Sequence, residues 1–275
     1  MQGIKRRGIL YLGLIIISVV MFSILLWDSE AKAAPNKQIY PTKSYTVRQR
    51  SQYPKPMLTI PILMYHEIGE GPNSLYVPLK NFREQIEYLK TQGYQVVTLS
   101  KAMELLKANQ SIPNSKYLVL TFDDGYASFY SQAWPVLQEA GMTATVFLIS
   151  QSVDQQRYLN WNDIRIMQNS GIEFGSHTRT HPSLPALGPE KMTKEISGSK
   201  KEIEERLGTS VLSFCYPSGE FNRESLAAVK NTGYLGAVST KQGLAQGGSN
   251  PFTLSRIRIN KGTRVKDLTK MLGKV

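Results

Sequence analysis

The chain has 275 residues, a net charge of +12 at pH 7, and hydrophobic residues at 41% of its positions. This length suits one barrel-sized domain with an extension. A single cysteine, Cys215, excludes an intramolecular disulfide, and its place in an apolar stretch predicts a buried thiol rather than a reactive one.

The N-terminal segment differs in composition from the rest of the chain. Three basic residues at positions 5–7 precede an uncharged, largely apolar span at residues 8–27. About twenty such residues can cross a bilayer as a helix, and basic residues before the span place the following chain outside the cell. We expect residues 1–30 to be a membrane anchor through residues 8–27, or a signal peptide cleaved near the Ala-Lys-Ala at residues 31–33. Either outcome predicts export, to the outer face of the membrane or into the medium.

Positive charge is concentrated before the predicted domain. Residues 1–57 hold nine Lys and Arg against two acidic residues, so +7 of the net +12 lies there and only +5 in residues 58–275. A nucleic-acid-binding protein usually carries its basic patch on the folded face, so we expect no nucleic-acid partner. Residues 31–57 are instead predicted to be a basic extracytoplasmic linker that faces anionic components of the cell envelope.

From residue 58 onward, short apolar runs alternate with amphipathic stretches. Strands are predicted at residues 61–65, 94–99, 117–120, 143–149, 171–175, 235–238 and 254–259. Helices are predicted at residues 81–92, 132–140, 192–207 and 224–231, most of them with a glycine one or two positions beyond, as at a helix C-cap. Repeated strand-helix units predict an α/β fold with a parallel sheet and outer helices. Periodicity alone does not decide whether that sheet is open or closed.

Two neighbouring carboxylates follow the apolar strand predicted at residues 117–120. The motif is Thr-Phe-Asp-Asp-Gly-Tyr at residues 121–126. Adjacent strand residues point to opposite faces, so Asp123 and Asp124 cannot both belong to a regular buried strand. Gly125 indicates a turn that lets both carboxylates face one cleft at the carboxyl end of the strand, where ligand sites of parallel α/β folds gather. The alternative is that one aspartate caps a helix beginning near Tyr126.

Two of the three histidines stand four residues apart. His177 and His181 lie in Ser-His-Thr-Arg-Thr-His, directly after the strand predicted at residues 171–175, and Pro182 ends any helix there. Neutral imidazole is the commonest metal ligand in proteins, so the pair predicts two ligands of one ion. A third ligand must come from elsewhere, and the tandem aspartates are the best source. The alternative is a pair of polar residues in a surface loop.

Together, in this order and each at a strand end, the two motifs resemble those of the polysaccharide deacetylases, also called the NodB-homology or carbohydrate esterase family 4 enzymes. The resemblance covers roughly residue 59 to the C-terminus. It implies a distorted, incomplete (β/α) barrel over residues 58–275, with Asp123 as the catalytic base. It also implies one divalent metal, usually zinc, with three protein ligands, namely Asp124, His177 and His181.

The chain departs from the commonest family pattern in its general acid. Many members carry a histidine near the C-terminus for this role, but no histidine follows His181 here. The remaining one, His66, ends the run Met-Tyr-His at residues 64–66. This run resembles the branch that includes the poly-N-acetylglucosamine deacetylases, and the resemblance implies that His66 is the acid. The alternative is a hydrogen-bonded structural histidine.

A second departure lies in Phe-Cys-Tyr-Pro-Ser-Gly at residues 214–219, where many members have Arg-x-Pro-Tyr-Gly. Cys215 stands at the position of the motif arginine, whose role is to orient the base. Pro217 and the glycine are retained, which nominates the backbone N–H of Ser218 as an oxyanion donor. Arg256, on the strand predicted at residues 254–259, is a candidate for the vacant orienting role. Its alternative is a solvent-facing position.

The resemblance implies a hydrolase that removes N-acetyl groups from an extracellular N-acetylglucosamine polymer. Peptidoglycan, poly-N-acetylglucosamine and chitin-like oligomers all fit this expectation. Tyr126 and Trp161 are candidate sugar contacts, with core packing as the alternative. Three other interpretations stay open, namely a metal-dependent O-acetyl esterase, a non-catalytic glycan-binding envelope protein, and an envelope protein that uses metal for stability alone.

Overall fold

The computed structural model describes residues 57–109 and 115–273. The membrane or signal segment predicted at residues 1–30, and the predicted linker apart from Met57, lie outside the described residues. Within the two described ranges, none of the helices combines the length and apolar character needed to span a bilayer.

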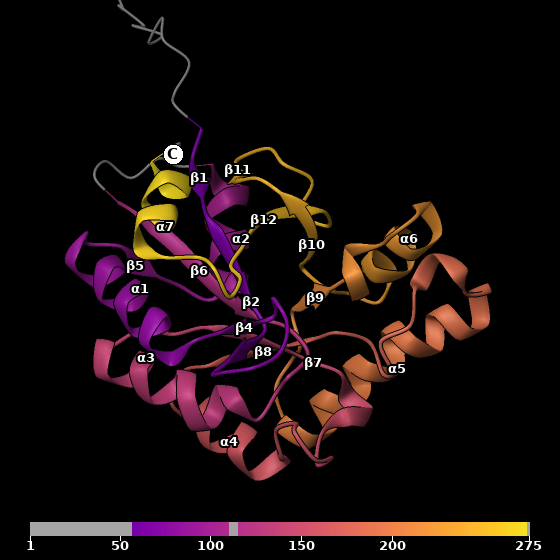
Figure 1. The fold of residues 1–275 in the computed structure, drawn as a ribbon. Helices are drawn as coiled ribbons and strands as arrows, with labels where there is room; N and C mark the ends of the chain where they lie inside the picture. The colour runs from indigo at the N-terminus through magenta and orange to yellow at the C-terminus, as the bar shows by residue number, and fades with distance from the viewer. Residues whose placement is uncertain (1–56, 110–114, 274–275) are drawn as a thin grey trace, which may run out of the picture. The chain divides into compact units, whose positions relative to one another are not determined.

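Seven parallel strands form a closed ring (Figure 1). In spatial order they are β2 (Ile62–Tyr65), β12 (Leu254–Arg258), β10 (Gly236–Gln242), β9 (Ser213–Cys215), β8 (Glu173–Ser176), β7 (Thr145–Leu148) and β6 (Tyr117–Phe122), which pairs back onto β2. The ring has one strand fewer than the eight of a complete (β/α) barrel. A further strand, β5 (Gln95–Val96), pairs only with the amino end of β6. Within the ring, the register of β10 against β12 shifts between Val238 and Gln242, so the barrel is distorted. The predicted distorted, incomplete barrel is therefore confirmed.

Besides β5, four short strands of the described residues lie outside the ring and form two pairs. β1 (Thr59–Ile60) pairs with β11 (Ala245–Gln246) in antiparallel fashion. β3 (Glu67–Ile68) pairs with β4 (Tyr76–Val77) in the segment that follows β2. This second pair gives the β2–α1 connection a defined shape beside the carboxyl end of the barrel.

Helices surround the ring (Figure 1). They are α1 (Leu79–Thr91), α2 (Leu99–Ala108), α3 (Trp134–Ala140), α4 (Trp161–Asn169), α5 (Pro189–Leu207), α6 (Arg223–Asn231) and α7 (Val265–Leu272). The prediction of a strand at residues 94–99 is wrong in its second half, because the strand ends at Val96 and α2 begins at Leu99. The Thr98 hydroxyl accepts a hydrogen bond from the Lys101 N–H and caps α2, and this cap converts an apolar run into a helix start.

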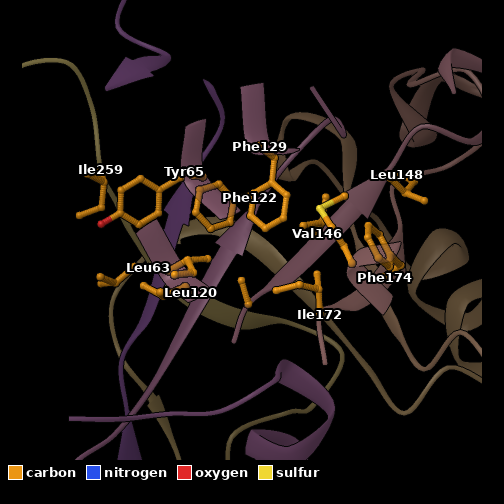
Figure 2. Close-up of a cluster of buried hydrophobic side chains, with 14 of the residues drawn as sticks. Leu63, Tyr65, Leu120, Phe122, Phe129, Val146, Leu148, Ile172, Phe174 and Ile259 are labelled. Atoms are coloured by element: carbon orange, nitrogen blue, oxygen red, sulfur yellow. The ribbon is translucent and has the colours of Figure 1, made fainter. Parts of the chain in front are cut away.

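Outward-facing strand residues pack against the helices. Figure 2 shows Tyr65, Phe122 and Phe129 lying side by side in this layer. The Tyr65 and Phe122 rings stack with centroids 5.1 Å apart, and Phe129 meets Phe122 edge-on at 4.7 Å. Burial of such aromatic side chains stabilises the fold by about 1.5–3 kcal/mol each.

Inward-facing residues form a second apolar cluster that includes the first helix after β5. Val119 and Phe147 belong to it, together with Leu99 and Met103 of α2. The Leu99 N–H donates to Thr145 Oγ1 at 2.9 Å, so α2 begins beneath the amino end of the barrel. Apolar side chains thus occupy much of this end of the barrel interior.

Candidate active site

The two-residue alternation of the strands brings the predicted site residues together inside the barrel. On β6, inward-facing Val119 and Thr121 are followed by Asp123. On β12 the alternation turns Arg256 inward. His66 follows β2 and His177 follows β8, each one residue beyond the end of its strand. The predicted site residues thus gather at the carboxyl end of the ring.

Asp123 and Arg256 form a buried bidentate ion pair. Arg256 Nη1 donates to Oδ1 at 2.7 Å and Nη2 donates to Oδ2 at 2.8 Å. The arginine is fully buried, and its remaining hydrogen bonds go to the Ser239 carbonyl, Thr121 Oγ1 and Cys215 Sγ. The solvent-facing alternative for Arg256 is therefore excluded. Its guanidinium occupies the space that the small Cys215 side chain leaves open.

This pairing fixes the charge of Asp123. Burial alone would raise its carboxyl pKa, but the charge and hydrogen bonds of Arg256 outweigh burial and hold that pKa far below its usual range. Asp123 is therefore an ionised proton acceptor throughout the neutral range.

His66 lies beside this carboxylate. Its Nε2 is 4.0 Å from Asp123 Oδ2, and its side chain is only 11% exposed. Burial lowers the pKa of His66, partly opposed by the charges of Asp123 and Asp124. A buried imidazole with a lowered pKa is a strong proton donor once it is protonated.

Three further side chains converge on one point next to Asp123. The ligand atoms of Asp124, His177 and His181 all lie within 4.8 Å of one another. Asp124 Oδ1 is 3.4 Å from His177 Nε2 and 3.7 Å from His181 Nε2. Asp124 and His181 have φ of 73° and 62°, so a left-handed backbone turns both side chains toward this point. The strand ends at Phe122, as the tandem aspartates predict.

The orientation of His177 suits metal binding. Its Nδ1 lies 2.7 Å from the Cys215 carbonyl oxygen, to which Nδ1–H donates, so Nε2 points toward Asp124 and is the ring nitrogen placed to bind an ion. Two imidazole nitrogens and one carboxylate fit a divalent ion such as zinc. Three protein ligands also leave coordination positions for water and substrate.

Helix α5 holds the loop between the two histidines, a feature that the sequence did not reveal. Glu195 accepts hydrogen bonds from the Arg179 and Thr180 N–H groups, both at 2.9 Å, and from Thr180 Oγ1. About two turns further along, Glu202 accepts from Arg179 Nε at 2.6 Å. Gly198 lies between them, and a Cβ there would approach Arg179 Cδ to 2.7 Å. The only indication of this contact in the sequence is the spacing of positions 195, 198 and 202, which places them on one face of the predicted helix.

The nominated oxyanion loop follows β9. Pro217 and Ser218 lie in a short 3₁₀ turn, Pro217–Gly219, and Ser218 is exposed with φ of 55°. Among the hydrogen bonds of residues 57–109 and 115–273, none is donated by the Ser218 N–H. That group is therefore available to a ligand.

The two nominated sugar contacts differ in exposure. Tyr126 is half-buried and stacks on Tyr158, with centroids 5.3 Å apart and planes 20° from parallel. Trp161 is only 8% exposed, belongs to the main core cluster and opens α4 after the N-cap Asn160. The ring of Trp161 packs in the core, so the sugar-contact prediction is withdrawn for that residue.

Comparison with known proteins agrees with these motifs. The family model described as "Polysaccharide deacetylase" matches residues 110–237. The putative polysaccharide deacetylase YxkH of Bacillus subtilis is 37% identical over 74% of this chain and 72% of its own length. A poly-β-1,6-N-acetyl-D-glucosamine N-deacetylase of Staphylococcus aureus is 24% identical over 67% of this chain and 68% of its own. The structure of the Streptococcus pyogenes deacetylase PplD in complex with acetate superposes with a TM-score of 0.75 and 28% identity, covering 79% of this chain and 99% of that one.

Proposed function

Because the chain belongs to the polysaccharide deacetylase family, whose members hydrolyse amide bonds, we propose that it removes N-acetyl groups from an N-acetylglucosamine polymer with a divalent metal. The observation that carries the proposal is the position of Asp123. This carboxylate is buried, ionised and locked by Arg256 beside three convergent metal-ligating side chains. The proposed base, acid and metal ligands thus lie together at the carboxyl end of the ring.

Asp123 accepts the proton of the attacking water. Its low pKa keeps it deprotonated, and the two hydrogen bonds from Arg256 fix the plane of the carboxylate. His66 donates a proton to the departing amine nitrogen, since its Nε2 lies 4.0 Å from Asp123 Oδ2, next to the proposed base. The exposed N–H of Ser218 donates a hydrogen bond to the oxygen that gains negative charge.

Asp124, His177 and His181 are the proposed ligands, and zinc is the ion that best suits two imidazoles and one carboxylate. When bound, such an ion acts as a Lewis acid that polarises a carbonyl and lowers the pKa of a water molecule bound to it.

The position of Arg256 supports a catalytic protein over a glycan-binding one. A decayed active site was conceivable because the motif arginine is replaced by Cys215. Arg256 reaches the same carboxylate from another strand, so the functional arrangement is retained. The poly-N-acetylglucosamine deacetylase among the relatives supports an amide substrate over an ester, and the polymer over other glycans.

We also propose that the domain works outside the cell. The support is the apolar span at residues 8–27, preceded by three basic residues. Protease treatment of intact cells that express the full chain should digest the domain. Protection of the domain until the cells are lysed would contradict export.

The function is tested by acetate release from a panel of glycans. The purified protein should release acetate from N-acetylglucosamine oligomers when loaded with zinc, and a chelator should abolish the release. Matched O-acetylated xylan oligomers serve as the ester control. Acetate from the ester substrates alone would favour the esterase, and acetate from none of the glycans would contradict catalysis.

A further inference from the structure

The Pro217–Gly219 turn, which carries the Ser218 N–H, contacts one residue of the neighbouring strand twice. That residue is Thr240 of β10, whose Oγ1 donates to the Ser218 carbonyl oxygen at 3.2 Å. Gly219 packs against the same threonine so closely that a Cβ there would overlap Thr240 Oγ1 and approach the Thr240 backbone N to 2.5 Å. The turn is therefore joined to Thr240 by a hydrogen bond and by a contact that needs glycine.

An irregularity in β10 places Thr240 beside this turn. Val238 pairs with position 254 of β12 and Gln242 pairs with position 256, so four steps along β10 match two along β12. Such bulges re-aim side chains and are common next to active sites. Here two successive residues of the bulge act on the site, because the Ser239 carbonyl accepts from Arg256 Nε at 2.9 Å and the Thr240 hydroxyl reaches the turn.

The backbone of Ser218 needs an anchor. Its φ of 55° and ψ of 8° lie in the left-handed region, which is unfavourable for a residue with a Cβ. The start of the turn is fixed by the Tyr216 N–H, which donates to the Val238 carbonyl at 3.2 Å, and its end closes locally when the Gly219 N–H donates to the Tyr216 carbonyl at 2.8 Å. The hydroxyl of Thr240 fixes the middle of the turn, at the strained residue itself.

We propose that Thr240 is a positioning residue that keeps the Ser218 N–H directed at the oxygen that gains negative charge during hydrolysis. The N–H and the carbonyl of Ser218 are joined by two backbone torsions, so a fixed carbonyl in this turn also fixes the direction of the N–H. Without its anchor the residue relaxes toward favourable backbone angles and the N–H turns away. The inference rests on the proposed deacetylase function, in which this N–H is the oxyanion donor.

Thr240→Val tests the hydrogen bond, because valine has the branched shape of threonine without the hydroxyl. On an N-acetylglucosamine oligomer, kcat of the zinc-loaded protein should fall about tenfold with KM unchanged, since the donor acts in the transition state. The loss is smaller than the hundred- to thousandfold that follows removal of an oxyanion donor. Thr240→Ser keeps the hydroxyl and should retain nearly wild-type kcat. Thr269→Val removes a similar bond, from a hydroxyl to the Val265 carbonyl in α7, and is the matched control.

Gly219→Ala tests the close contact. Gly219 has φ of 75°, and Gly93, after α1, has φ of 73° with no atom near enough to meet a Cβ. Gly93→Ala therefore introduces the same backbone strain without the clash, and only Gly219→Ala should lower kcat by more than tenfold. The double variant Gly219→Ala/Thr240→Val should lose less than the product of the two single losses, because both changes break one link.

The Ser218 amide resonance, followed by ¹H–¹⁵N NMR, reports on the link without turnover. It should shift in Thr240→Val and Gly219→Ala, and stay in place in Thr240→Ser and in the two controls. A wild-type kcat in Thr240→Val, or an equal fall in Thr240→Ser or Thr269→Val, would overturn the positioning role. A wild-type protein that releases acetate from no N-acetylated glycan would overturn the proposed function instead, while the resonance would still show whether Thr240 holds the turn.

Discussion

The guanidinium of Arg256 binds both carboxylate oxygens of Asp123, at 2.7 and 2.8 Å, although the two residues are 133 positions apart. The same guanidinium contacts Cys215 Sγ at 3.2 Å, at the motif position that holds arginine in many family members. The proposed base is thus oriented from β12 rather than from the loop after β9. The two parallel hydrogen bonds fix the plane of the Asp123 carboxylate, and the positive charge of the guanidinium keeps that carboxylate ionised.

Replacing Arg256 should lower both the unfolding free energy and the turnover rate. Arg256→Met leaves the Asp123 carboxylate buried without a partner, which should cost about 3–5 kcal/mol of unfolding free energy. Arg256→Lys keeps the charge without the two-pronged geometry and should lose less stability than Arg256→Met, but still most of the activity. Urea denaturation and steady-state kinetics measure the two effects.

The pH dependence of these variants gives a further check. The base must be deprotonated, so kcat falls as pH decreases through the pKa of Asp123. Arg256 lowers that pKa and burial raises it, so the acid limb of the profile should move to higher pH in Arg256→Met. An acid limb at the wild-type position would show that Arg256 does not control the base.

The three proposed ligands should be individually essential for metal binding. Asp124→Ala, His177→Ala and His181→Ala each remove one of three protein ligands, so each should lose tight zinc binding and nearly all turnover. Zinc content after dialysis and competition with a chelator measure the loss. Full zinc occupancy with normal turnover in any one variant would show that the ligand set is wrong.

Asp123→Asn should separate the base from the ligands. The amide keeps the shape of the side chain but cannot take a proton from water, so zinc content should stay normal while most turnover is lost. The experiment needs only zinc analysis and acetate release on the same preparation. Near-normal turnover would remove Asp123 from the role of base.

The sequence was sufficient to predict the positions of candidate-site residues that directly follow a strand. The two motifs follow β6 and β8, whose apolar runs and terminal glycines identify them as buried strands that stop and turn. Parallel strands end at the same edge, so the convergence of Asp124 and His177 was expected from the pattern.

What the sequence could not settle depends on contacts between distant elements. The ring closes when β6 and β12 both pair with β2, and only this closure sets Arg256 opposite Asp123. Burial of Trp161 is likewise a consequence of how α4 packs on the barrel. The hydrogen bonds of Glu195 were not predicted, because a charged residue on a predicted helix is ordinarily solvated and its place on one helix face does not by itself identify a partner.

Glu195 should act on metal affinity through the loop that carries His181. Glu195→Ala leaves the Arg179 and Thr180 N–H groups without their acceptor, so zinc affinity should fall by about 10–100-fold. Activity should recover at saturating zinc, and Glu195→Gln should be intermediate. Glu205→Ala, at an exposed position of α5, is the control. Unaltered zinc affinity in Glu195→Ala would limit this residue to a stabilising role.

We expect His66 to affect the pH dependence of the unfolding free energy even in the absence of substrate. Burial lowers its pKa below the ordinary value of about 6.5, so in mildly acidic solution the unfolded chain binds a proton that the folded chain does not. Wild-type stability should therefore fall as pH drops below that value. His66→Ala lacks this contribution and should lose less stability over the same interval, as measured by urea denaturation at several pH values.

The catalytic role of His66 is the final prediction, and it follows from position and chemistry together. Departure of an amine requires a proton, and His66 Nε2 lies 4.0 Å from Asp123 Oδ2 at the carboxyl end of β2. His66→Ala should bind zinc normally while kcat falls by about a hundred- to ten-thousandfold. In the wild type, kcat should fall with rising pH as His66 loses its proton. This fall should be absent in His66→Ala. The rate loss should be smaller on an acetate ester than on the amide, because an alkoxide leaves with less assistance than an amine. An equal loss on both substrates would indicate that His66 shapes the cleft without donating the proton.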